Sequence, residues 1–174
     1  MPFSDQAIFT SDGLLKLDHL PKSMTIVGGG VIGVEYACML ATLGVKITLV
    51  EGRHELLGFL DHEITEAMQY QMRRMGITLR LGEKVAKIEQ LANDPTGATQ
   101  VEATLESGKT LHAQTLLFAV GRQGTTVALR LDKVGLVADD RERLKVNENF
   151  QTTVPNIYAV GDVIGFPALA STAM

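Results

Sequence analysis

Residues 24 to 36 read Met-Thr-Ile-Val-Gly-Gly-Gly-Val-Ile-Gly-Val-Glu-Tyr, and this stretch decides the fold. The apolar run before the glycines predicts a short buried strand, and the residues after them are typical of a helix. Between the two, the pattern Gly-x-Gly-x-x-Gly falls on Gly28, Gly30 and Gly33. A strand, a glycine-rich turn and a helix in this order predict a loop that binds the pyrophosphate of a dinucleotide.

Each glycine of this pattern has its own expected task. Gly28 allows a tight turn out of the strand, Gly30 lets the backbone approach the pyrophosphate, and Gly33 lets the helix pack against the strand. The first turn of the helix then offers unpaired N–H groups and the positive end of its dipole to the phosphates. A turn that merely joins strand to helix is the alternative interpretation.

An acidic residue completes the dinucleotide pattern. Glu51 ends a second apolar run, 45–50, so its carboxylate is placed to accept hydrogen bonds from the adenosine ribose. A carboxylate there favours the free 2′-hydroxyl of NAD, whereas Arg53 is able to reach the 2′-phosphate of NADP. Arg53 is equally compatible with a solvated surface side chain. The sequence therefore leaves the choice between NAD and NADP open.

Composition and charge exclude several classes of function. The 174 residues are 45% hydrophobic and 21% charged, with a net charge of −4 and no basic stripe, so nucleic acid is not an expected partner. No apolar run approaches the length of a membrane span, and residues 1–5 are not typical of a signal peptide. The single cysteine, Cys38, excludes an internal disulfide and fits a cytoplasmic location. The four histidines are scattered, so no metal site is expected.

The remaining pattern predicts an α/β fold: a Rossmann-like parallel sheet with helices on one face and a three-stranded antiparallel meander on the other. A helix over 61–75 places Ile64, Met68, Met72 and Met75 on one face, which is expected to join the core. Further strands are expected at 46–50, 77–81, 84–91, 99–105, 109–113, 115–120 and 156–160.

Several motifs, in their order, resemble the pyridine nucleotide-disulfide oxidoreductase family of flavoproteins. They are Gly-Gly-Gly-Val-Ile-Gly-Val-Glu at 28–35, Leu-Leu at 56–57 with Asp-His-Glu-Ile at 61–64, Ala-Val-Gly-Arg at 119–122, and Pro-Asn-Ile-Tyr-Ala-Val-Gly-Asp at 155–162. The resemblance implies a segment leading in from an FAD domain at 1–23, an NAD(P)-binding domain at 24–145, and a partial return into the FAD domain at 146–174. The chain would then be a fragment that binds NAD(P) and catalyses nothing by itself.

The resemblance also implies which residues bind cofactors. Glu35 would lie at the nicotinamide end, Val85 on the adenine side and Gly121 beside the nicotinamide ribose. Their alternatives are a carboxylate favoured by the helix dipole, a strand core residue and a plain turn. Asp162 would hold the ribityl chain of FAD. The complete expected set is Gly28, Gly29, Gly30, Val31, Ile32, Gly33, Glu35, Glu51, Arg53, Val85 and Gly121 for NAD(P), and Asp162, Ala168, Leu169, Ala170 and Ser171 for FAD, with no catalytic or metal-binding residue.

Residues 57–61 and 161–171 are most similar to family members that pass hydride from NADPH through FAD to NAD⁺. The alternatives are a dihydrolipoamide dehydrogenase-like disulfide reductase, whose cysteine pair would lie upstream, and a stand-alone NAD(P)-sensing module. The expected partners are nicotinamide dinucleotides and the rest of the flavoprotein, which would form a homo-oligomer through its dimerisation domain.

Overall fold

The chain folds into two compact units, Met1–Gly121 and Arg122–Met174, which are described separately. The computed structural model describes residues 7–92, 97, 99–121 and 124–165. These units do not coincide with the expected boundaries at 23 and 145. The assignment of the segments 1–23, 24–145 and 146–174 to parts of a flavoprotein stays a prediction.

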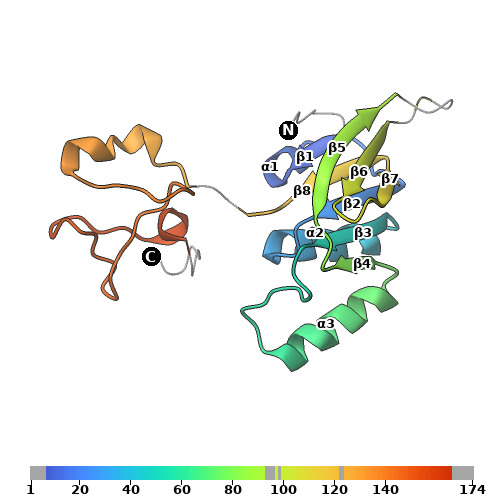
Figure 1. Ribbon diagram of the computed structural model, residues 1–174, viewed down its shortest axis with the longest axis horizontal. Helices are drawn as coiled ribbons and strands as arrows, with labels where there is room; N and C mark the ends of the chain where they lie inside the picture. The colour runs from blue at the N-terminus through green and yellow to red at the C-terminus, as the bar shows by residue number, and fades with distance from the viewer. Residues whose placement is uncertain (1–6, 93–96, 98, 122–123, 166–174) are drawn as a thin grey trace. The chain divides into compact units, whose positions relative to one another are not determined.

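The first unit is built on a five-stranded parallel sheet (Figure 1). Its spatial order is β1 (Ile8–Thr10), β8 (Thr115–Phe118), β2 (Ser23–Val27), β3 (Lys46–Glu51) and β4 (Thr78–Leu81). The last four were expected from the apolar runs. β1 was not, because a three-residue strand carries too little pattern to be recognised. It pairs with β8, so residues 8–10 belong to the same sheet as β2, the strand that leads into the glycine-rich loop.

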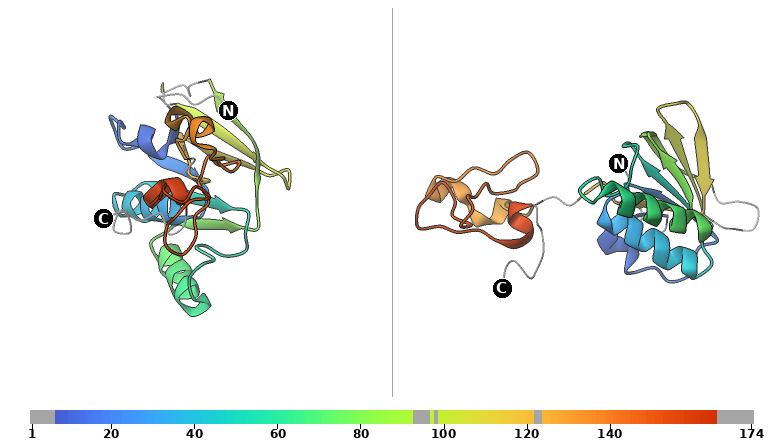
Figure 2. Two further views of the ribbon diagram at one scale, coloured as in Figure 1. Left: turned by 90° about the vertical axis from the view of Figure 1, so that its left-hand side faces the viewer. Right: turned by 90° about the horizontal axis from the view of Figure 1, so that it is seen from below.

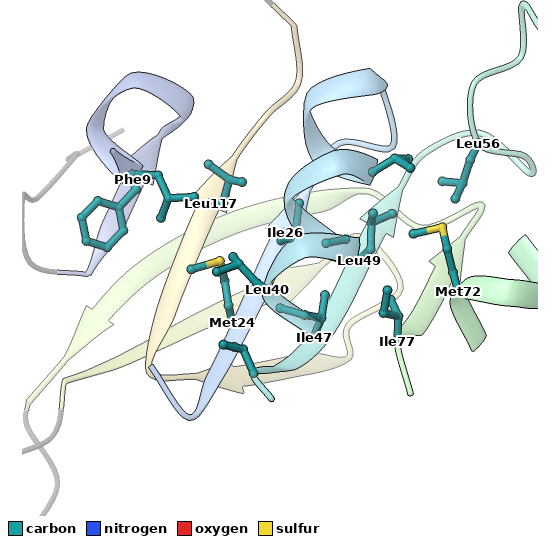
Figure 3. Close-up of a cluster of buried hydrophobic side chains, with 14 of the residues drawn as sticks. Phe9, Met24, Ile26, Leu40, Ile47, Leu49, Leu56, Met72, Ile77 and Leu117 are labelled. Carbon is teal, nitrogen blue, oxygen red and sulfur yellow. The ribbon is translucent and has the colours of Figure 1, made fainter. Parts of the chain in front are cut away.

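Helices cover one face of this sheet (Figure 2, right). The helix α2 (Val31–Thr42) begins after Gly30 and returns the chain to β3, while α3 (His62–Arg74) leads to β4. Asp61 caps α3 by accepting a hydrogen bond of 3.0 Å from the backbone N–H of Glu63. The short α1 (Ser11–Leu14) buries Leu14 in the same core. Figure 3 shows this core, in which Phe9, Met24, Ile26, Leu40, Ile47, Leu49, Leu56, Met72, Ile77 and Leu117 are buried.

An antiparallel meander forms a second core on the opposite face of the sheet. Its strands are β5 (Val85–Leu91), β6 (Gln100–Leu105) and β7 (Thr110–Ala113), in that order. Ile88, Val101 and Ala103 from the meander are buried with Val27 and Leu116 of the parallel sheet. The expected fold class is therefore confirmed.

The buried face of α3 differs from the expected apolar stripe. Met72 is fully buried, and Met68 and Met75 pack against the core, but Ile64 is 60% exposed. Thr65 and Gln69 occupy the buried positions instead. Neighbouring residues point in directions about 100° apart around a helix axis. The start of α3 is therefore rotated by one residue, so that Thr65 faces the core where the hydrophobic pattern indicates Ile64.

Between residues 124 and 165, the described part of the second unit, lie three short 3₁₀ helices: η1 (Val127–Leu129), η2 (Leu131–Val134) and η3 (Gly161–Ile164). Leu136, Leu144 and Ala159 form its small core. The expected strand at 156–160 is wrong: Tyr158 makes only an isolated bridge to Gln151. The run is apolar, but only Ala159 within it is buried, because no neighbouring strand among the described residues of this unit extends the pairing.

Candidate dinucleotide-binding site

Two glycines of the loop are required by the fold itself. Gly28 has a φ of +111°, and a Cβ there would collide with the backbone oxygen of Ala119. A Cβ on Gly33 would collide with the backbone oxygen of Gly28, which lies directly beneath the first turn of α2. Both glycines therefore let the loop and the helix lie close to the ends of β2 and β8.

Gly30 is a glycine for a different reason. Its φ is −78°, which any residue adopts, and no described atom lies within 4 Å of the position that a Cβ would take. Gly30 is the N-cap of α2, so the N–H groups of 31–33 start the helix without partners in its own ladder. Open space in front of donors at the positive end of a helix dipole suits an anion such as a pyrophosphate.

Glu51 points at this loop. It is the last residue of β3, and its Oε2 accepts a hydrogen bond of 2.6 Å from the N–H of Gly29. Its Oε1 accepts from the backbone N–H of Arg53 at 2.9 Å and from Nε of the Arg53 guanidinium at 3.1 Å. The side chain of Glu51 is only 11% exposed. The structure thus brings the acidic residue and the glycine loop together, as the spacing predicted.

The surroundings of Glu51 favour its charged form. Partial burial alone would raise the pKa of this carboxyl group, but the hydrogen bonds from Arg53 and Gly29 outweigh it and hold the pKa below its ordinary value. The same pairing raises the pKa of Arg53. The pair therefore stays ionised around neutral pH, with the carboxylate accepting hydrogen bonds from Gly29 and Arg53.

Two leucines support the loop from the segment between β3 and α3. The side chain of Leu56 is fully buried, and a Cβ on Gly29 would collide with it. Leu57 has a φ of +46° and donates its backbone N–H to the carbonyl oxygen of Gly29 at 3.3 Å. In the sequence these leucines are recognisable only as part of a motif, because leucine carries no signal for a positive φ.

An open groove of about 910 Å³ lies beside Arg53. The exposed side chains of His54, Tyr70 and Arg73 line it, together with the buried Gln69 and three glutamates of the loop and α3. This groove was not expected, because it depends on how α3 packs beside β4 and the loop after β3.

The other expected residues lie in three places. Glu35 is exposed on α2, Val85 begins β5 and packs against the second core, and Gly121 follows β8 with a φ of +120°. Backbone hydrogen bonds hold the segments of Val85 and Gly121 beside the site. Near Val85, the N–H of Glu83 donates to the backbone oxygen of Glu51. Near Gly121, the N–H of Ala119 donates to the backbone oxygen of Val27. Asp162 lies in η3 of the second unit. Ala168, Leu169, Ala170 and Ser171 lie outside the described residues.

Among the residues that the structure describes, no cluster of three or more side chains is arranged to hold a metal ion. In that same part of the chain, no helix has the length and apolar character of a membrane span.

The glycine loop, the carboxylate and the sheet edge that joins them match a known family. The family model described as pyridine nucleotide-disulphide oxidoreductase covers residues 3–174. The chain belongs to this family. The chain is similar to the soluble pyridine nucleotide transhydrogenase of Mycobacterium tuberculosis, which is 46% identical over 99% of the chain. The enzyme of the same name from Photorhabdus laumondii is 48% identical over 98% of the chain. The chain spans 36% of the length of each of these relatives.

Two solved structures share the fold of this chain. The flavoprotein disulfide reductase RclA from Escherichia coli is 34% identical, with a TM-score of 0.79, over 92% of this chain and 35% of its own. LpdA from Mycobacterium tuberculosis is 28% identical, with a TM-score of 0.85, over 98% of this chain and 36% of its own. The chain is thus part of a flavoprotein oxidoreductase fold, and the expected use of NAD(P)(H) and FAD agrees with the family.

Proposed function

We propose that this chain binds NAD(H) and NADP(H) as the dinucleotide-binding part of a flavoprotein transhydrogenase, which passes hydride from NADPH through FAD to NAD⁺. Gly30 is the observation that carries the proposal. The fold does not require a glycine at this position. A ligand whose phosphates lie against the start of α2 would require one, because a side chain there would occupy its space.

A dinucleotide bound to this chain would use residues of the first unit along its whole length. The N–H groups of 31–33, together with Gly28–Gly30, would hold the pyrophosphate, and Glu51 would accept hydrogen bonds from the adenosine ribose. Val85 would lie on the adenine side, with Glu35 and Gly121 toward the nicotinamide.

In the longer protein, Asp162 and 168–171 would contribute to the FAD site, and the bound flavin would supply the two-electron chemistry. The protein would then contribute mainly position, by holding the nicotinamide ring where it can react. No acid or base among the residues of this chain is needed for hydride transfer, so we expect the chain alone to bind dinucleotides without turnover.

The names of the relatives support the transhydrogenase assignment. A dihydrolipoamide dehydrogenase-like disulfide reductase is the second candidate, which the structural similarity to the flavoprotein disulfide reductase RclA favours. A stand-alone NAD(P)-sensing module is the third. We propose in addition that the whole protein is a cytoplasmic homo-oligomer, consistent with the single cysteine and the family resemblance.

Titration of the chain with NADH and with NADPH tests the proposal, with nicotinamide fluorescence as the readout and FAD as the control ligand. We expect saturable binding of both dinucleotides, with dissociation constants of about 1 μM to 1 mM, and much weaker binding of FAD. If neither dinucleotide binds at concentrations several times the largest expected dissociation constant, the proposed function is refuted.

A further inference from the structure

The Glu51 carboxylate is fully occupied in the free protein. It accepts from the N–H of Gly29 at 2.6 Å, from the N–H of Arg53 at 2.9 Å, and from Nε and Nη2 of the Arg53 guanidinium at 3.1 and 3.4 Å. A carboxylate offers about four lone-pair positions, and these four donors use them. A ribose hydroxyl can therefore bind to Glu51 only when one donor leaves.

The donor that leaves most easily is the Arg53 guanidinium. Its two contacts are the longest of the four, and its side chain is 57% exposed, so water can replace the carboxylate as its partner. The other two donors are backbone groups. The Gly29 peptide is also held by Leu57, whose N–H donates to the Gly29 carbonyl oxygen.

We propose that Arg53 and the ribose hydroxyls compete for the Glu51 carboxylate, so that Arg53 weakens the binding of NAD(H) while it strengthens the binding of NADP(H). This inference rests on the proposed function and deepens it. A bound NAD(H) displaces the guanidinium and offers it no new anion at the ribose. A bound NADP(H) carries a 2′-phosphate there, which a guanidinium can bind through two parallel hydrogen bonds.

The competition has a consequence for selectivity. Glu51 alone would favour NAD(H) over NADP(H), because it accepts from the 2′-hydroxyl and repels a 2′-phosphate. Arg53 opposes this preference on both sides, by occupying the carboxylate and by attracting the phosphate. The pair thereby brings the two affinities closer together, which suits a site that takes both dinucleotides in turn.

The variant Arg53→Ala, titrated with NADH and NADPH in the full chain, tests the competition. We expect NADH to bind about two- to fivefold more tightly, which corresponds to the loss of an exposed ion pair. NADPH should bind about tenfold more weakly or worse, because a charge-assisted contact to its phosphate is lost. In the background of Glu51→Gln, Arg53→Ala should give no gain for NADH, since no carboxylate remains to be released.

Arg74→Ala is the matched control, because it removes the same charge from an exposed position that neither contacts Glu51 nor lines the groove. It should weaken both dinucleotides slightly and equally. Unchanged or weaker NADH binding by Arg53→Ala, or a gain that persists in the Glu51→Gln background, would overturn the competition alone. Failure of the unmodified chain to bind either dinucleotide would overturn the proposed function, and the competition with it.

Discussion

The glycines of the loop separate into those that the fold needs and one that it does not. Gly28 and Gly33 would collide with backbone atoms if they carried a Cβ, whereas Gly30 faces open space. Sequence pattern alone assigned the same three tasks, but it could not distinguish a functional glycine from a connecting turn. For Gly28 the distinction depends on Ala119, which follows β8 and lies far away in the sequence, and for Gly33 it depends on the backbone oxygen of Gly28.

Replacement of Gly30 by valine should abolish NADH binding while the fold persists. The new side chain would fill the space in front of the first N–H groups of α2 and displace a pyrophosphate. The free energy of unfolding should fall by no more than about 1 kcal/mol, the usual cost of a poor N-cap. Fluorescence titration and urea denaturation measure the two effects.

Gly33→Ala is the informative counterpart of this variant. Its Cβ meets the Gly28 backbone oxygen, so stability should decrease by about 1–3 kcal/mol or more from overpacking. If Gly30→Val instead bound NADH normally, the loop would have no role in dinucleotide binding.

Residue types and spacing were sufficient to predict that Glu51 faces the glycine loop, but not that Arg53 holds its carboxylate. The two side chains are only two positions apart, and whether they pair depends on the turn after β3. In that turn the Arg53 carbonyl oxygen accepts from the N–H of Gly82 in the next loop. Contacts of this kind come from the tertiary structure and leave no pattern in the sequence.

At the scale of elements, α3 shows where hydrophobic periodicity fails. The pattern indicated a face through Ile64 and Met68, whereas the helix buries Thr65 and Gln69. The pattern located the helix within one residue at each end, since the expected range was 61–75 and α3 spans His62–Arg74. It did not fix the rotation, since the methionines on either side of the true face are flexible enough to reach the core.

Substitution of Thr65 by valine should stabilise the first unit. The Thr65 hydroxyl is buried, and it has no hydrogen-bond partner among the described residues. Valine has almost the same shape, so the change removes the cost of an unpaired buried hydroxyl, about 1 kcal/mol. Hydrogen exchange of the α3 amides in urea reports the change in unfolding free energy.

Thr152→Val provides the opposite case. The buried Thr152 hydroxyl lies within hydrogen-bond distance of two backbone carbonyl oxygens, at 3.1 Å from that of Val154 and 2.9 Å from that of Ile157. Its loss should destabilise the second unit by about 1–2 kcal/mol. Equal effects of the two substitutions would show that the Thr65 hydroxyl has a partner in solution.

The turn at 139–143 predicts a pH-dependent contribution to stability in the second unit. The Arg143 guanidinium and the backbone N–H groups of Arg143 and Arg141 bind the Asp139 carboxylate and lower its pKa to about 2. Because the folded pKa lies below the ordinary value of 3.8, this contribution is complete above that value and disappears as the pH falls toward 2.

An NMR titration of the Asp139 carboxyl carbon measures this pKa directly. Arg143→Gln should move the midpoint up toward the ordinary value, whereas Arg130→Gln, which removes an arginine paired with Asp132, should leave it in place. A midpoint near 3.8 in the unmodified chain would contradict the proposed pairing.

For the whole molecule, the boundary after Gly121 leads us to expect that the first unit, Met1–Gly121, binds a dinucleotide by itself. All the described residues assigned to NAD(P) lie in the first unit, although the sequence predicted a binding domain that continues to 145. A chain that ends at Gly121 should therefore keep its NADH affinity within about a factor of two. A loss of more than about tenfold would show that the second unit contributes to the site.

The position of β8 governs the order in which this protein can be assembled. β8 lies between β1 and β2 in the sheet, yet it is the last of the five strands to be synthesised. The Thr115 hydroxyl donates to the backbone oxygen of Ser23, 92 positions earlier in the chain. A ribosome-bound nascent chain can thus pair β2 with β3 and β3 with β4, but it leaves β1 without its sheet neighbour until Phe118 has left the exit tunnel.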